Sequence, residues 1–105
     1  MKNNVQLIGN LGMNPEITNF DSGAKKVRFT LATNEYYKAK DGSKEQKTAW
    51  HNLFAWGPTA SYISKVGKKG AQLAITGKLV TQKYTSKEGK ERRFTAIQVE
   101  RAIAL

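Results

Sequence analysis

Apolar residues that alternate with polar ones are the feature that most restricts how this chain can fold. In Lys26–Asn34, the apolar residues Val27, Phe29 and Leu31 occupy every second position, and polar or small residues separate them. Successive side chains of a β-strand point to opposite faces of a sheet, so this spacing predicts a strand with one core face. The same alternation recurs in Arg92–Arg101. We therefore expect an all-β protein.

The order of the predicted elements narrows the fold class further. Strands are expected at 5–11, 26–34, 48–56, 73–84 and 92–101, with a short extended piece at 16–20 and one short helix at 58–66. Three strands, a helix and two strands match a five-stranded Greek-key OB-fold barrel with its helix between strands 3 and 4. An SH3-like or other small barrel would share much of this pattern.

Two polar segments connect predicted strands and are rich in lysine. The segment Lys38–Lys47 contains a turn at Asp41-Gly42, and we expect a long mobile hairpin loop there. The segment Thr85–Glu91 is expected to form a second hairpin tip. The length of 105 residues predicts a single domain spanning residues 1–105.

The charge of the chain indicates the kind of partner. Eighteen Lys and Arg residues oppose eight Asp and Glu residues, which gives a net charge of +10. Such an excess favours a polyanion, because each cation that neutralises a phosphate releases a condensed counterion. No apolar run approaches the ~20 residues of a membrane span, and no basic amphipathic helix is visible, so we expect no membrane partner. The chain has no cysteine, and a cytoplasmic location is the default expectation.

Catalytic chemistry has little support in the sequence. His51 is the only histidine, and it has no acidic or thiol partner nearby in the chain. The acidic residues are scattered beside lysines without a metal-ligand spacing, and no glycine-rich loop precedes a helix. We therefore expect no enzyme activity, no catalytic residue, no bound metal and no cofactor.

The aromatic residues, in contrast, favour a binding surface. Trp50 and Trp56 are six positions apart, so a strand places both rings on one face. Tyr37 and Tyr84 lie among lysines, as does Tyr36. Unpaired bases stack on such rings while cations follow the phosphates, which is the chemistry of single-stranded nucleic acid binding. Cross-strand packing is the plain alternative for any one ring.

Two phenylalanines remain ambiguous at this level. Phe54 lies between the tryptophans on the same nominal face, but a curled strand could turn it into the core. Phe94 could simply cover a neighbouring strand. Alternation alone does not decide between these positions.

Six segments of the chain resemble bacterial single-stranded DNA-binding proteins. They are G-N-L-G-M-N-P-E at Gly9–Glu16, F-T-L-A-T-N-E at Phe29–Glu35, T-A-W-H-N-L-F-A-W-G at Thr48–Gly57, K-K-G at Lys68–Gly70, I-T-G-K-L at Ile75–Leu79 and T-Q-K-Y-T at Thr81–Thr85. The resemblance covers nearly the whole chain, in order. It implies an OB-fold that assembles as a homo-oligomer, most commonly a homotetramer.

The resemblance also implies roles for individual residues. It assigns base stacking to Tyr37, Trp50, Trp56 and Tyr84, and phosphate contacts to Lys40, Lys69 and Lys83. His51 matches a histidine near a subunit interface, and residues 4–8 would lie in the dimer contact.

This chain departs from the family pattern at several positions. Members of the family often have tryptophan at the positions of Tyr37 and Tyr84, phenylalanine at Trp56 and a basic residue at Asn52. Typical members also continue into a flexible linker and an acidic tip that recruits other proteins. This sequence stops at Leu105 without either, which leaves tail-mediated protein partners in doubt.

The resulting functional prediction is sequence-independent binding and protection of single-stranded DNA in replication, recombination and repair. A bacterial, nucleoid-associated protein of the cytoplasm is expected. A primosomal-type or RNA-binding OB-fold protein is the alternative, and a dimer would favour the primosomal interpretation. A protein-interaction module that uses the aromatic face for an apolar partner would leave the charge of +10 without a role.

Overall fold

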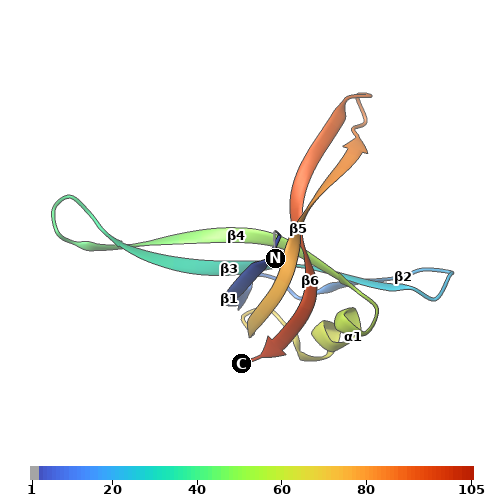
Figure 1. Cartoon of the computed structure of the whole chain (residues 1–105), viewed down its shortest axis with the longest axis horizontal. Helices are drawn as coiled ribbons and strands as arrows, with labels where there is room; N and C mark the ends of the chain where they lie inside the picture. The colour runs from blue at the N-terminus through green and yellow to red at the C-terminus, as the bar shows by residue number, and fades with distance from the viewer. Residues whose placement is uncertain (1–2) are drawn as a thin grey trace.

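The computed structural model describes residues 3–105 as a curled β-sheet with one helix (Figure 1). The elements are β1 (Val5–Leu11), β2 (Glu16–Asn19), β3 (Lys25–Lys38), β4 (Lys44–Trp56), α1 (Gly57–Val66), β5 (Gln72–Thr85) and β6 (Glu91–Ala104). The strand order is β1-β5-β6-β4-β3-β2, and a further pairing of β1 with β3 closes the sheet. The barrel therefore consists of β1, β3, β4, β5 and β6, with β2 added on the outer edge of β3.

The closure of the barrel confirms the predicted OB-fold. All pairings are antiparallel except that of β4 with β6, where Leu53 faces Ile97 in parallel register. The helix α1 lies between β4 and β5 in the chain, which are the third and fourth barrel strands. The extended piece expected at 16–20 is the short strand β2.

The core lies inside the barrel and is formed by the alternating apolar residues. Val27, Phe29 and Leu31 of β3 are fully buried, as the sequence predicts. Ala60 and Ile63 of α1 are also fully buried and belong to the same cluster. Pro58 stands in the first turn of α1, where its missing N–H has no partner to lose. The helix thus contributes its apolar side to the core of the barrel.

The predicted loop at Lys38–Lys47 is wrong for much of its length. The β3–β4 ladder continues without a break from Lys26 opposite Trp56 to Lys38 opposite Lys44, and only the turn between the strands is irregular. The polar residues there form a two-stranded arm that extends away from the barrel (Figure 1). Its backbone hydrogen bonds are made within the ladder, so polar side chains on both faces can remain in water.

The strands β5 and β6 form a second arm, which leaves the barrel in another direction (Figure 1). Beyond Gly77, β5 no longer pairs with β1, and the β5–β6 register shifts between Thr76 and Gly77. A Cβ atom at Gly77 would overlap the carbonyl oxygen of Gln98 on β6. A β-bulge at this point increases the local twist, and the close backbone approach requires a glycine.

Candidate nucleic-acid interface

The outer face of β4 carries both tryptophans. Trp50 lies opposite Ala32 and Trp56 lies opposite Lys26 in the unbroken β3–β4 ladder. The two side chains therefore share one face, and they are 62% and 42% exposed. The buried Leu53 and Ala55 occupy the opposite face of the same strand. The tryptophan face is thus the outer surface of the barrel.

The backbone of Gly12 lies against the ring of Trp50. Its N–H donates a hydrogen bond to the carbonyl oxygen of Thr30 at 3.1 Å, which ties the chain after β1 to β3. A Cβ atom at Gly12 would overlap Cζ3 of Trp50 and would lie 2.9 Å from its Cη2. The six-membered ring of the indole therefore lies against the backbone of Gly12, while most of the Trp50 side chain remains exposed.

Trp56 belongs to a small group of aromatic and cationic side chains, and the other members of this group were not predicted as site residues from the sequence. The ring of Phe20, which follows β2, lies 5.7 Å from that of Trp56 at an interplanar angle of 31°. The Lys26 ammonium lies 5.2 Å from the centroid of Trp56 and 5.0 Å from that of Phe54. Such cation–π contacts hold a positive charge between two rings. Phe20 had no lysine beside it in sequence, so only the folded β2–β3 hairpin reveals its place.

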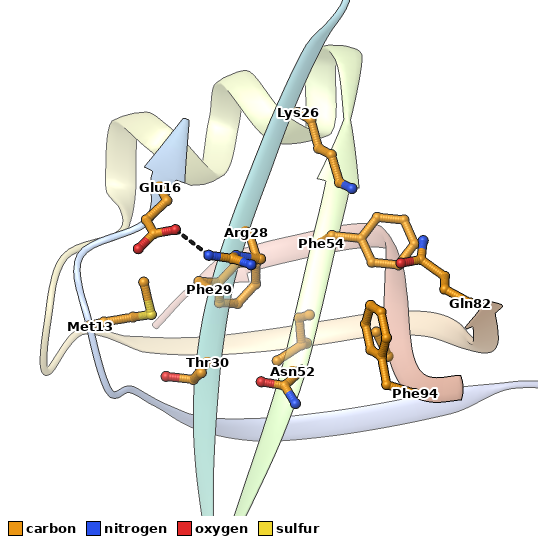
Figure 2. A pocket seen from close by; sticks show the side chains of 12 residues that line it. Met13, Glu16, Lys26, Arg28, Phe29, Thr30, Asn52, Phe54, Gln82 and Phe94 are labelled. Carbon is orange, nitrogen blue, oxygen red and sulfur yellow. Dashed lines mark hydrogen bonds and ion pairs between the residues drawn. The ribbon is translucent and has the colours of Figure 1, made fainter. Parts of the chain in front are cut away.

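Phe54 shares the face of the tryptophans but is only 5% exposed. Its ring forms part of the wall of a concavity between β3–β4 and the β5–β6 arm (Figure 2). The sequence left open whether Phe54 lies in the core or on the face of the tryptophans. It lies on that face but is buried, because the outer surface of the barrel is concave at this point.

The β3–β4 arm carries Tyr37 and Lys40, far from the tryptophans along the ladder. Tyr37 is half exposed, and its hydroxyl donates a hydrogen bond to Oε2 of Glu45 at 2.8 Å. This bond to a carboxylate raises the pKa of the Tyr37 phenol above its usual value. Tyr36 lies on the other face of the arm and is 72% exposed. Strand parity places Tyr36, rather than Tyr37, on the same face of the ladder as Trp50.

The β5–β6 arm carries Tyr84 and Lys83. Tyr84 is half exposed, and the ring of Phe94 meets it edge-on with 5.9 Å between centroids. Phe94 is itself exposed, so it extends the aromatic surface from Tyr84 towards the barrel. The ammonium of Lys83 lies 3.8 Å from Glu91 Oε1, and both side chains are exposed. That ion pair is weak enough to exchange for a phosphate.

Two other residues singled out in the sequence lie elsewhere. Lys69 is in the turn between α1 and β5, where its backbone N–H donates to Oδ1 of Asn14 at 2.8 Å. His51 is half buried, and its Nε2 lies 2.9 Å from the hydroxyl of Thr33. The structure therefore brings Trp50 and Trp56 together on the barrel, while Tyr37 and Tyr84 lie on two separate arms.

The chemistry of this surface is that of stacking and charge. Within residues 3–105, no three His, Asp or Glu side chains gather closely enough to hold a metal ion. No helix in the described part of the chain is long and apolar enough to cross a membrane. Exposed rings and lysines are what the surface offers to a ligand.

Comparison with known proteins gives consistent matches. The profile of the "Single-strand binding protein family" matches residues 2–105. Proteins named "Single-stranded DNA-binding protein 1" from Xylella fastidiosa and Chlorobaculum tepidum are each 39% identical, over 93% and 88% of this chain. The matched regions cover 73% and 57% of those two relatives.

Solved structures of similar fold include one with bound nucleic acid. A structure described as "Plasmodium falciparum SSB complex with ssDNA" superimposes with a TM-score of 0.89 at 27% identity, covering 100% of this chain and 96% of that one. A single-stranded DNA-binding protein from Thermus aquaticus, solved as a deletion mutant, gives a TM-score of 0.85 at 21% identity and covers 98% of this chain and 50% of that one. The second match bears on the fold alone.

Proposed function

We propose that this chain, which belongs to the single-strand binding protein family, holds single-stranded DNA of any sequence on the aromatic surface of its barrel and arms. Membership of this family makes the chain a non-enzymatic protein that binds single-stranded DNA, with the general roles of the family in replication and repair. The proposal concerns the residues that hold the strand, the assembly and the site of action.

The exposure of the rings is the observation that carries the proposal. Trp50, Trp56, Tyr37 and Tyr84 are each between 42% and 62% exposed on a chain with a net charge of +10. Large aromatic side chains left in water lose the favourable free energy of burial unless a ligand covers them. Stacking of a base on each ring would contribute ~1–3 kcal/mol and would not depend on the identity of the base.

Lysines beside these rings would contact the phosphates. Lys40 is in the turn of the β3–β4 arm, Lys83 is next to Tyr84, and Lys69 is in the turn after α1. Lys26, held between Phe54 and Trp56, is a further candidate that the sequence did not single out. Each contact would release about one counterion, so affinity should fall steeply with salt.

The family is oligomeric. We propose that residues 1–105 form one DNA-binding domain and that four copies of the chain assemble into a homotetramer. Ile8 of β1, Ala74 of β5 and Ile103 of β6 lie side by side in register, and both isoleucines are more than half exposed. This apolar stripe would be covered by another copy. The cytoplasm, in association with the nucleoid, is the proposed location because the bacterial relatives are DNA-binding proteins.

The direct test is a titration with oligo-dT while tryptophan fluorescence is recorded. The tryptophan fluorescence of the parent protein should be quenched on binding. The affinity of Trp50→Ala for oligo-dT should be lower by about fivefold or more, because one stack is lost. Tyr62→Leu removes an exposed ring from α1, away from both arms, and serves as the control. Binding of equal strength by the Trp50→Ala and Tyr62→Leu variants would contradict the stacking assignment.

Competition with oligo-rU of the same length tests DNA against RNA, and mass measurement in solution separates tetramer from dimer.

A further inference from the structure

The β5–β6 arm is joined to the barrel over a short base. On the β6 side, pairing with β4 in the described part of the chain is limited to Ile97 and Gln98. On the β5 side, the last backbone pair with β1 joins Gly77 to Val5. Tyr84 lies beyond both points, so its position relative to the barrel depends on the angle at which the arm leaves.

The side chain of Asn3 holds the arm beyond the last backbone pair. Its Nδ2 donates a hydrogen bond to the carbonyl oxygen of Leu79 at 3.0 Å, and its Oδ1 accepts one from the N–H of Leu79 at 2.9 Å. Two residues that face each other in an antiparallel ladder exchange the same two bonds through their backbones. The carboxamide of Asn3 therefore takes the place of a strand backbone, at the base of the arm beside the start of β1 (Figure 1).

A side chain can make this connection where a backbone cannot. Paired strands lie about 4.7–4.9 Å apart, and the bulge between Thr76 and Gly77 increases the twist of β5 as it leaves the barrel. The contact between Asn3 and Leu79 lies two positions further along, where the ladder of β1 with β5 has ended. The carboxamide extends from the Asn3 backbone, so it spans the wider gap.

This contact lies outside the core. Asn3 is exposed, and Leu79 is 51% exposed. Water competes for exposed hydrogen bonds, so the two bonds add little to the stability of the fold. Among residues 3–105, no other side-chain hydrogen bond or ion pair joins residues 79–96 to the barrel. The contact therefore acts on the direction of the arm more than on the core.

A small change of angle at the base becomes a large movement of the ring of Tyr84. Tyr84 is five positions beyond Leu79, which is about 17 Å along a strand at ~3.4 Å per residue. A rotation of about 10° at the base would move the ring by about 3 Å over this length. Stacked atoms pack best about 3.5–4.0 Å apart, so a base would lose most of its contact with a ring displaced that far.

We propose that Asn3 is a positioning residue for single-stranded DNA binding, because its carboxamide fixes the angle of the β5–β6 arm and so the place of Tyr84. The inference rests on the proposed function, since it takes Tyr84 as a stacking ring. Asn3 acts through the arm, and it adds to the DNA-binding machinery a residue that carries neither a ring nor a charge.

A double-mutant cycle with Tyr84→Ala tests this connection. The affinity of the whole protein for labelled oligo-dT is measured at one salt concentration. Asn3→Ala should bind about threefold more weakly, which is part of the effect of a whole stack, and should change nothing further once Tyr84 is alanine. Asn4→Ala removes the neighbouring exposed amide and should bind as tightly as the parent. A role of Asn3 in stability alone would not depend on Tyr84.

Distances between spin labels test the angle of the arm directly. The chain has no cysteine, so Lys87→Cys at the arm tip and Ser61→Cys on α1 introduce one label pair per copy. Labelled chains are diluted with unlabelled chains before assembly, so that distances within one copy are measured. Without DNA, the distribution of distances should broaden in Asn3→Ala and not in Asn4→Ala.

Asn3→Asp provides a second variant with a smaller change of shape. It keeps Oδ1 as the acceptor for the Leu79 N–H and replaces the donor by an oxygen that faces the Leu79 carbonyl oxygen. The label distances should broaden in this variant also, and Asn4→Asp controls for the added charge.

Several results would overturn the inference. An unchanged affinity of Asn3→Ala, or a loss that adds to that of Tyr84→Ala, would exclude action through the ring. Equal label distances in the parent and in Asn3→Ala would exclude control of the arm angle, and equal losses in Asn3→Ala and Asn4→Ala would exclude a specific role of Asn3. Failure of the proposed function looks different, since Tyr84→Ala would then bind oligo-dT as tightly as the parent while the label distances still responded to Asn3→Ala.

Discussion

Substitution of Gly12 by alanine should weaken DNA binding while leaving the fold almost unchanged. The added Cβ would overlap Cζ3 of Trp50 and lie 2.9 Å from both Cη2 of Trp50 and Oγ1 of Thr30. Carbon atoms pack best about 3.5–4.0 Å apart, so the overlap with Cζ3 requires the edge of the indole to move outward by more than about 1 Å. Trp50 is 62% exposed, and its ring can swing into solvent without disturbing the core.

The expected magnitudes for Gly12→Ala follow from this geometry. The free energy of unfolding should fall by less than about 1 kcal/mol, as for most substitutions that leave the core intact. A stacked base is worth ~1–3 kcal/mol, and a tilted or displaced ring should lose about 1 kcal/mol of that. The affinity for oligo-dT should therefore fall about fivefold.

A double-mutant cycle with Trp50→Ala is the assay for Gly12→Ala. Fluorescence anisotropy of labelled oligo-dT gives the affinity of each variant at one salt concentration, and thermal unfolding reports the fold. If Gly12 acts only by supporting the indole, Gly12→Ala should change nothing further once Trp50 is alanine. Additive losses of affinity would refute this reasoning, as would an unchanged affinity of the single variant.

Two further predictions concern the arms. In Gly77→Ala the Cβ meets the backbone oxygen of Gln98, which cannot swing away, so stability should fall by about 1–3 kcal/mol in urea unfolding, and an unchanged midpoint would contradict the assigned close approach. In the β3–β4 turn, hydrogen bonds from the hydroxyl and then the backbone N–H of Ser43 lower the pKa of Asp41. A lowered pKa means that the turn is stabilised at neutral pH and that this stabilisation is lost as the pH falls through the pKa of the folded state. The protection of the Ser43 amide against exchange, relative to its intrinsic rate at each pH, should fall there in the parent but not in Asp41→Asn, and equal protection profiles would exclude the role of the carboxylate.

The two arms show where sequence reasoning about the fold failed. Lys44–Trp56 includes four polar residues, from Lys44 to Lys47, that read as loop because neither face of the strand is apolar. Alternation of apolar and polar residues indicates a strand that buries one face. A strand in an arm that projects from the barrel buries neither face, so it shows no such alternation. The same error hid the face on which Tyr36 lies, because its even spacing from Ala32 places it on the face of Trp50 only if the strand continues.

Alternation at Val27, Phe29 and Leu31 and the order of the strands were sufficient to predict a small all-β barrel, because a buried face of a strand produces a two-residue period in the sequence. Spacing likewise placed Trp50 and Trp56 on one face. Only the tertiary structure decided that Phe54 lines a hollow in that face and that Gly12 lies under Trp50. Those relations join residues from different strands, and no periodicity along one strand records what a neighbouring strand brings beside it.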